Sequence, residues 1–378
     1  MPAAVDVVVV GGGQSALAAA YHLVRANRRR ERLLTFVVLD DRAVPGGAWT
    51  EGWSSLRLFS PAAHSSLPGW PMPPWTGPGT PPAAHVRDYL AAFEARYALP
   101  VLRPVRVREI DASDPRAVLV RTDAGDVRAR AVLSATGTWS RPFRPAFPGA
   151  EDFGGRQLHT VDYHGPAGYA GHRVLVVGGG NSAAQVAADL LLADPPPARV
   201  VWAAREQPRL LPDDVDGRAL FEAATRAVAG EGPGVGGLGD VVAVPSVQHA
   251  RDRRGLRAVP LPERLTPTGA RWADDGVGGG AREEAVDDVV WCTGFRPALV
   301  PVTGVGLRRV DGHPLTRADH PTVSADDPRL LFVGYGDWTG AASATLIGAN
   351  RSARDAVGHL TELLDRPEEQ APGPGRDA

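Results

Sequence analysis

Two glycine-rich turns, each placed between an apolar strand-like run and a helix-like run, are the parts of this chain best suited to chemistry. The first turn carries Gly11, Gly13, Gln14 and Ser15, and the second carries Gly178, Gly180, Asn181 and Ser182. In each turn the first glycine permits a tight bend, the third lets a pyrophosphate approach the backbone, and the following helix presents unpaired N–H groups to the anion. Each turn therefore predicts a dinucleotide site, with an ordinary glycine turn of another α/β fold as the alternative.

The residue after the second strand of each unit differs in charge between the two units. Asp40 follows a predicted strand at 35–39, and Arg205 follows one at 200–204. This position faces the adenosine ribose, where a carboxylate accepts bonds from free hydroxyls and a guanidinium pairs with a 2′-phosphate. We therefore expect FAD in the first site and NADPH in the second. A solvated Arg205, in a site that prefers NADH or does not discriminate, is the alternative.

The order of strand, glycine turn, helix and strand occurs twice, and each round ends in a Thr-Gly pair. The pairs are Thr136 with Gly137 and Thr293 with Gly294. A predicted strand at 330–334 and helix at 341–364 then remain to complete the first round. The fold class is therefore α/β, with two Rossmann-like dinucleotide-binding domains, the NADP domain inserted into a discontinuous FAD domain. We expect the FAD-binding domain at 1–145 and 295–365, the NADP-binding domain at 155–290 and a disordered tail at 366–378.

The segment that joins this last strand to this last helix has its own chemistry. Gly336 and Asp337 lie there, and the Asp337 carboxylate could accept a bond from the ribityl chain of a flavin. A helix that begins near Ala341 would aim its positive end at the flavin pyrimidine ring and stabilise charge gained on reduction. The alternative is that Asp337 caps the helix.

Composition excludes several other classes of function. The chain has 378 residues and a formal net charge of -2, which predicts no nucleic-acid or anionic-membrane partner. Cys292 is the only cysteine, so a redox-active C-x-x-C pair is absent, and we expect Cys292 to be a small buried hydrophobe. The aspartates at 213, 214 and 216 lack calcium-loop spacing and predict a capped turn, so no metal is expected. No apolar run reaches transmembrane length or resembles a secretory signal, which predicts a cytoplasmic protein.

Several motifs of the chain, and their order along it, resemble those of the two-dinucleotide-binding-domain flavoproteins, and within them the flavin-containing monooxygenases. The glycine turns, the Ala-Thr-Gly that ends at Gly137 and the Gly336-Asp337 pair contribute to the resemblance. A Gly-Gly-x-Trp motif adds Gly47, Ala48 and Trp49 as flavin-binding residues. The run 153–160 resembles the F-x-G-x-x-x-H-[ST] fingerprint of these monooxygenases. The chain is most similar to flavin monooxygenases of arsenic-resistance operons.

The resemblance implies a reaction sequence. NADPH reduces FAD, dioxygen adds to the reduced flavin, and the resulting hydroperoxide transfers one oxygen atom to a small soft nucleophile (nitrogen, sulfur or trivalent arsenic) or to a ketone. The implied partners are a small-molecule substrate and dioxygen. The oligomeric state stays open, with a dimer as one option. The long irregular loop at 67–82, which carries Trp70 and Trp75, is the predicted element that closes over the reaction and excludes water.

Two residues are candidates for a direct part in the reaction. Ser60 stands where relatives often carry an asparagine near the flavin, and its hydroxyl can still donate one hydrogen bond. His159 belongs to the fingerprint run, and a histidine that links the domains through hydrogen bonds would occupy the same place. Because the asparagine is missing, a second function stays open, in which the enzyme passes electrons from NAD(P)H through FAD to a protein or quinone without oxygenation. A nucleotide-binding sensor without turnover is a third.

Overall fold

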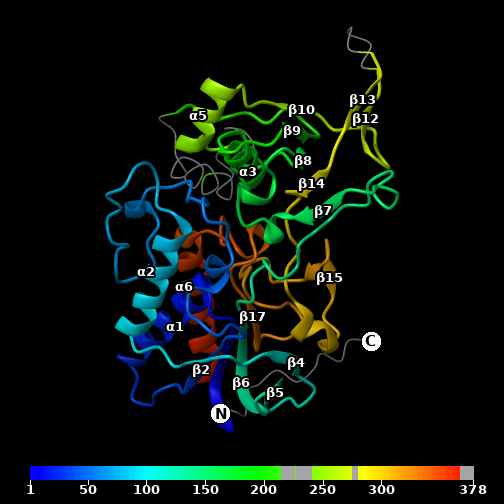
Figure 1. The fold of residues 1–378 in the computed structure, drawn as a ribbon. Helices are drawn as coiled ribbons and strands as arrows, with labels where there is room; N and C mark the ends of the chain where they lie inside the picture. The colour runs from blue at the N-terminus through cyan, green and yellow to red at the C-terminus, as the bar shows by residue number, and fades with distance from the viewer. Residues whose placement is uncertain (214–225, 227–240, 275–279, 367–378) are drawn as a thin grey trace.

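The computed structural model describes residues 1–213, 226, 241–274 and 280–366 (Figure 1). The predicted tail beyond 366, the aspartates at 214 and 216, and a loop predicted to be flexible at 230–240 lie outside these described residues. Within the described part of the chain, no helix is both long and apolar enough to cross a membrane.

The first domain is built on a sheet with the strand order β3-β2-β1-β6-β5-β4, in which β17 also pairs with β6. Strands β1, β2, β3, β6 and β17 run parallel, whereas β4 and β5 form an antiparallel extension. The strands are β1 Ala4–Val10, β2 Phe36–Leu39, β3 Val101–Leu102, β4 Val107–Asp111, β5 Val118–Thr122, β6 Val127–Ser134 and β17 Leu330–Phe332. The helices are α1 Gln14–Asn27, α2 Ala83–Arg96 and α6 Leu346–Asp365. The C-terminal β17 and α6 thus complete the first domain, as the sequence predicted.

The second domain is built on a smaller parallel sheet with the order β10-β9-β8-β14-β7. Its strands are β7 Arg156–His159, β8 Arg173–Val177, β9 Arg199–Ala204, β10 Ala258–Pro260 and β14 Asp288–Trp291, and its helices are α3 Asn181–Leu191 and α5 Pro245–Arg254. An antiparallel sheet of β11 Arg264–Thr266, β12 Gly269–Trp272 and β13 Arg282–Ala285 extends from it, and β15 Arg309–Val310 pairs with β16 His313–Pro314 in the returning chain. In Figure 1 the second domain sits above the first, and the chain crosses between them twice.

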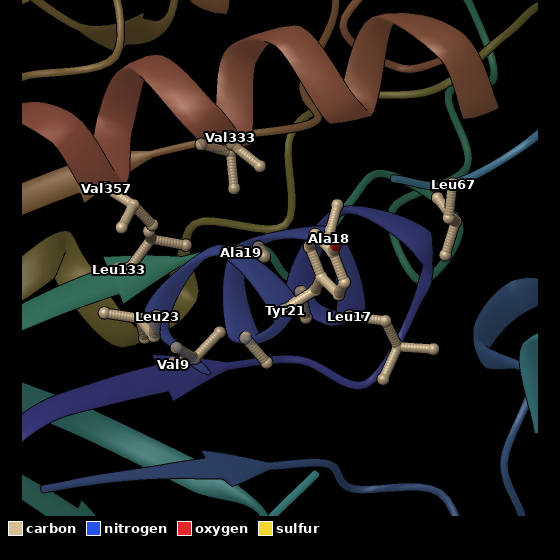
Figure 2. Close-up of a cluster of buried hydrophobic side chains, with 14 of the residues drawn as sticks. Val9, Leu17, Ala18, Ala19, Tyr21, Leu23, Leu67, Leu133, Val333 and Val357 are labelled. Atoms are coloured by element: carbon tan, nitrogen blue, oxygen red, sulfur yellow. The ribbon is translucent and has the colours of Figure 1, made fainter. Parts of the chain in front are cut away.

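Burial on both faces explains why the central strands are apolar without alternation. Val7, Val8 and Val9 of β1 are fully buried, because helices cover one face of the sheet and chain from the antiparallel extension covers the other. Figure 2 shows α1 between β1 and α6, with Leu17 and Leu23 of α1 in the same cluster as Val357 of α6. The C-terminal helix therefore contributes to the core that supports the first glycine turn.

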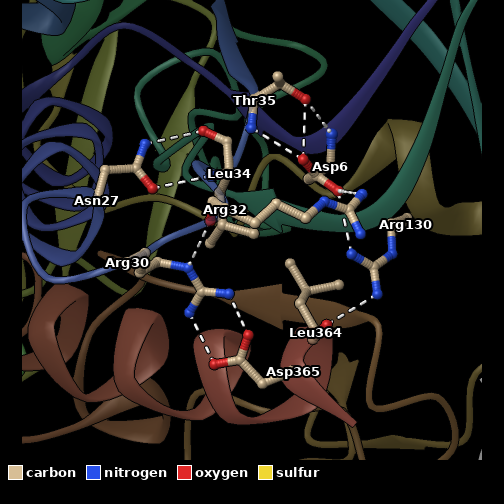
Figure 3. A network of polar contacts seen from close by, with 9 residues as sticks. All are labelled: Asp6, Asn27, Arg30, Arg32, Leu34, Thr35, Arg130, Leu364 and Asp365. Carbon is tan, nitrogen blue, oxygen red and sulfur yellow. Dashed lines mark hydrogen bonds and ion pairs between the residues drawn. The ribbon is translucent and has the colours of Figure 1, made fainter. Parts of the chain in front are cut away.

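A polar network fastens the two ends of the first domain together (Figure 3). Asp6 of β1 accepts hydrogen bonds from the backbone and hydroxyl of Thr35 and pairs with Arg130 of β6. Arg130 also donates to the Leu364 carbonyl, and Arg30 pairs with Asp365 at the end of α6. The helix that returns after the inserted domain is thereby tied to the strands that begin the chain.

Two predicted elements differ from those observed. The last helix begins at Leu346, not near Ala341, because Ala342 adopts a left-handed conformation and the Thr345 hydroxyl accepts the Gly348 N–H as the N-cap. The sequence also predicts a hairpin strand at 127–130 and a further strand that ends at 134, and in the structure they form one continuous strand, β6. The loop at 67–82 contains no helix or strand, as predicted.

Candidate functional site

The first glycine turn is held open by the backbone around it. Gly11 has φ +110°, and a Cβ there would lie 2.4 Å from the Ala135 carbonyl oxygen at the end of β6. Gly13 is the N-cap of α1, no side chain caps it, and the nearest atom to a Cβ there would be Gly47 Cα at 4.0 Å. The helix N-terminus is therefore an open cradle for an anion.

Asp40 lies beside this turn, as predicted. Its side chain is fully buried at the end of β2, and a Cβ on Gly12 would collide with its carboxylate. Burial raises the pKa of Asp40, and a 3.0 Å bond from Arg103 Nε to Oδ2 opposes that rise. Glu94 of α2 binds the other end of the same guanidinium. The sequence showed no motif around Arg103 or Glu94, and reasoning from sequence missed both residues.

Segments distant in sequence meet at this turn. Trp49, in the short 3-10 helix Gly47–Thr50, donates from its indole to Gln14 Oε1 at 2.8 Å, and Gln14 Nε2 donates to the Ala344 carbonyl at 2.7 Å. A Cβ on Gly47 would lie 2.7 Å from Gly13 Cα, so Gly47 and its neighbour Ala48 pass directly over the helix N-terminus. The predicted residues of the Gly-Gly-x-Trp motif are thus placed beside the first turn.

The ends of β6 and β17 complete the same edge of the sheet. The Tyr335 hydroxyl lies 2.6 Å from the hydroxyls of both Ser134 and Thr136, and it accepts the Thr136 N–H at 3.1 Å. The Thr136 hydroxyl also donates to the Ala298 carbonyl, so this side chain braces the chain crossing; Gly137 beside it has φ +64° and open space. Gly334 lies against Ser15, with a Cβ position 2.2 Å from the serine hydroxyl. Sequence reasoning assigned no role to Tyr335 or Gly334, although both lie in the segment that joins the last strand to the last helix.

Asp337 is exposed and follows Gly336, which has φ +98°. Its carboxylate accepts the Ala342 N–H at 3.2 Å, but Thr345 caps α6. The alternative that Asp337 caps this helix is therefore wrong. The carboxylate keeps a free oxygen at the C-terminal edge of the parallel strands, where ligands of such sheets bind.

The second glycine turn repeats the geometry of the first. Gly178 has φ +148°, and a Cβ there would lie 2.3 Å from the Cys292 carbonyl at the end of β14. Gly180 is the N-cap of α3, without a side-chain cap and without any atom within 4 Å of a Cβ position. Around Gly179 the nearest atoms belong to Ala204 and Pro208, so no carboxylate occupies the place that Asp40 takes in the first domain.

The polar residues of the second turn have different surroundings. The Asn181 side chain accepts the Val242 N–H at 2.9 Å, which ties it to the fold, whereas Ser182 is half-buried on the first turn of α3. Arg205 is exposed directly after β9, and among the described residues it has no hydrogen-bond or ion-pair partner. Its guanidinium is available for an anionic group of a ligand.

His159 and the second Thr-Gly pair brace the connection between the domains. His159 is 2% exposed, its Nε2 donates to the Gly294 carbonyl at 3.0 Å, and its Nδ1 accepts the Val161 N–H. Burial lowers its pKa, so the ring is neutral, and both nitrogens are engaged. The Thr293 hydroxyl donates to the Phe143 carbonyl at 2.6 Å. This geometry supports a linking role for His159 and gives it no opening to a substrate.

Ser60 lies in a segment that bridges the domains. The Arg57 N–H, three residues earlier, donates to Gln185 of α3 at 3.1 Å. Ser60 is half-buried, with its hydroxyl 3.1 Å from that of Ser65, which donates to the Pro61 carbonyl. Because the Ser65 proton is used there, the Ser60 hydroxyl donates to Ser65 in this arrangement. Cys292 is half-buried, where the sequence predicted a buried residue, and the surrounding protein still raises the pKa of its thiol to about 12.

Comparisons with known proteins identify the family of this chain. The family described as pyridine nucleotide-disulphide oxidoreductase matches residues 30–213. A flavin-containing monooxygenase from Stenotrophomonas maltophilia is 45% identical, with 96% of this chain and 100% of that chain covered and a TM-score of 0.84. An uncharacterized CzcO-like oxidoreductase of Geobacillus kaustophilus is 32% identical over 46% of this chain and 48% of its own length. A Baeyer-Villiger monooxygenase of Streptomyces coelicolor is 32% identical over 46% of this chain and 33% of its own.

The match to these two curated relatives thus spans about half of their length or less. The match to the solved Stenotrophomonas structure, by contrast, runs the full length of that chain and covers 96% of this one. The chain therefore belongs to the flavin-containing monooxygenase family.

Proposed function

We propose that this chain is an NADPH-dependent FAD monooxygenase that inserts one oxygen atom from dioxygen into a small soft nucleophile (nitrogen, sulfur or trivalent arsenic) or a ketone. The observation that carries the proposal is the contrast between two similar turns, one with the buried carboxylate of Asp40 and one with the exposed guanidinium of Arg205, which has no partner within the described part of the chain. A carboxylate suits free ribose hydroxyls, and a guanidinium suits a 2′-phosphate.

The residues of the first domain fit a flavin dinucleotide. The uncapped N-terminus of α1 and the empty space at Gly13 suit a pyrophosphate, and Asp40 suits the adenosine ribose. Asp337 keeps an oxygen for the ribityl chain. When bound, FAD supplies electron transfer and oxygen activation, and the protein supplies binding, orientation and exclusion of water. Further residues proposed to line this site are Gly11, Gln14, Ser15, Gly47, Ala48, Trp49, Thr136, Gly137 and Gly336.

The residues of the second domain fit NADPH for parallel reasons. The uncapped N-terminus of α3 at Gly180 suits its pyrophosphate, and Arg205 suits the 2′-phosphate. Because Arg205 is exposed, its contribution to affinity is screened by salt, which predicts weaker NADPH selectivity at high ionic strength. Gly178, Asn181, Ser182, Thr293 and Gly294 complete the proposed site.

We propose that the loop at 67–82 excludes water between the domains. Trp70 and Trp75 pack against the core of the first domain, and the Tyr89 hydroxyl of α2 donates to the Trp70 carbonyl at 2.7 Å. At its other end, a Cβ on Gly79 would touch the Pro245 ring of α5 at 2.6 Å. A loop in contact with both domains can close over a reaction centre between them.

A reductase that passes electrons through FAD to a protein or quinone is the second candidate. The observation that favours it is at Ser60, whose proton is used in a hydrogen bond to the Ser65 hydroxyl. Rotation of the Ser65 hydroxyl would free it, because the two hydroxyls can exchange donor and acceptor roles. The Ser60 proton would then be free to bond a ligand.

Coupled consumption of NADPH and dioxygen distinguishes the two functions. The holoenzyme is assayed with organic sulfides, amines, ketones and trivalent arsenicals under isotopically labelled dioxygen. The monooxygenase incorporates one labelled atom into product for each NADPH oxidised with at least one substrate class. Release of all oxygen as hydrogen peroxide with every class, together with fast reduction of an artificial quinone, would establish the reductase instead.

A further inference from the structure

The carboxylate of Asp40 is buried away from water. Its side chain is fully buried between the first glycine turn and the edge strand β3. A buried carboxylate is costly unless it is paired and hydrogen-bonded. The groups that face it are few: the Arg103 guanidinium, which also holds Glu94 of α2, and the backbone N–H and side-chain charge of Arg42.

The two oxygens of the Asp40 carboxylate are used unequally. Oδ2 accepts the Arg103 Nε–H at 3.0 Å, whereas Oδ1 accepts, among the residues that the structure describes, only the Arg42 N–H at 3.4 Å. Arg103 cannot rotate away, because its two terminal nitrogens bind both oxygens of Glu94 at 2.6 and 2.8 Å, and its side chain is 11% exposed. The planar Arg103 guanidinium, with all three of its nitrogens hydrogen-bonded, fixes the orientation of the carboxylate that it contacts. Oδ1 is left with acceptor capacity.

We infer that Arg103 is a positioning residue for the flavin nucleotide: it holds Oδ2 of Asp40 so that Oδ1 is presented, in the charged state, to the adenosine ribose hydroxyls. The inference rests on the proposed function, in which FAD occupies the first site. Glu94 acts one step further away by fixing the guanidinium. Neither residue needs to touch the nucleotide for this role.

The side chains of Asp40, Arg103 and Glu94 could instead serve only to hold α2, β2 and β3 together. The two roles differ in which ligands lose affinity when Arg103 is replaced. If Arg103 only stabilises the fold, its loss weakens binding of every flavin dinucleotide alike. If it positions Asp40, its loss weakens only those ligands whose adenosine carries ribose hydroxyls.

The test measures dissociation constants of the apoprotein for FAD and for an FAD analogue with a dideoxy adenosine ribose. Arg103→Gln is expected to weaken FAD binding by about tenfold to a hundredfold, the range for hydrogen bonds to a charged group, and to leave the affinity for the analogue unchanged. Arg103 opposes the rise that burial causes in the pKa of Asp40, so the carboxylate of the variant is protonated at a higher pH. When the pH is lowered, the variant should therefore release FAD at a higher pH than the wild type does. Arg108→Gln, at an exposed arginine on β4 of the same sheet, is the matched control.

Arg103→Lys keeps a charge without the fork, and it serves if Arg103→Gln does not fold. It is expected to fold and to lose affinity for FAD but not for the analogue. Equal losses for both ligands, or no loss for FAD, would overturn the inference while wild-type FAD binding still upheld the proposed function. A wild-type protein that does not bind FAD would overturn both.

Discussion

Gly13 offers a substitution that separates nucleotide binding from folding. Its φ of −84° and ψ of −173° are open to any residue, and the nearest protein atom to an added Cβ is 4.0 Å away. Gly13→Ala should therefore cost about 1 kcal/mol or less in folding free energy, the difference between glycine and alanine at an N-cap. The added methyl group instead fills the cradle that a pyrophosphate must enter. Loss of its charge-assisted hydrogen bonds, about 1.5–3 kcal/mol, weakens FAD binding by about tenfold to 150-fold.

Gly11→Ala is the control, because it should reduce folding stability more than Gly13→Ala does. The positive φ costs about 1–3 kcal/mol for a non-glycine residue, and a Cβ placed 2.4 Å from the Ala135 carbonyl oxygen adds overpacking of about 1–3 kcal/mol. A domain of this size loses about 2–4 °C of Tm for each kcal/mol, so the apoprotein should melt about 4–24 °C lower. Thermal unfolding of the apoproteins and FAD titrations followed by flavin fluorescence give both quantities. The reasoning is refuted if Gly13→Ala binds FAD like the wild type, or if it is destabilised as much as Gly11→Ala.

The second domain and the domain connection give the remaining predictions. Gly180→Ala should keep the Tm and raise the KM for NADPH, whereas Gly178→Ala should lower the Tm; equal Tm losses would show that the two turns are not built alike. Arg205→Gln should raise the KM for NADPH by about tenfold, from one charge-assisted contact at an exposed position, and leave the KM for NADH unchanged; a parallel rise in both would contradict the assigned contact. Burial lowers the pKa of His159 below its ordinary value of 6.5, so stability is complete above pH 6.5 and is lost as the pH falls below it. Urea unfolding on both sides of pH 6.5 should show a smaller pH dependence in His159→Gln, and an unchanged dependence would mean that other buried groups cause it.

The fold could be predicted because its signals are local. Each glycine turn lies between an apolar run and a helical pattern, and the second round repeats the first, so the inserted arrangement follows from chain order. The start of α6 could not be predicted, because hydrophobic spacing does not reveal that Ala342 takes a left-handed conformation and that Thr345 supplies the cap. Helix ends depend on single hydrogen bonds, which sequence periodicity does not contain.

The surroundings of the site depend on contacts across the chain. Asp40 follows a strand and could be named from its position, but its partners Arg103 and Glu94 come from an edge strand and a separate helix and carry no motif. The same holds for Arg57 and Gln185, which join the two domains through two hydrogen bonds between the Arg57 backbone and the Gln185 side chain. Such partners are set by tertiary packing, so the sequence identified the residues proposed to meet ligands better than those that hold them in place.

The account depends on two nucleotide sites in one chain that exchange electrons, and an anaerobic titration tests this directly. Protein loaded with FAD is mixed with NADPH in the absence of dioxygen while the flavin absorbance is followed. We predict one tightly held FAD per chain, fully bleached by one NADPH. A flavin that stays oxidised in excess NADPH, or a chain that binds only one of the two nucleotides, would contradict the account.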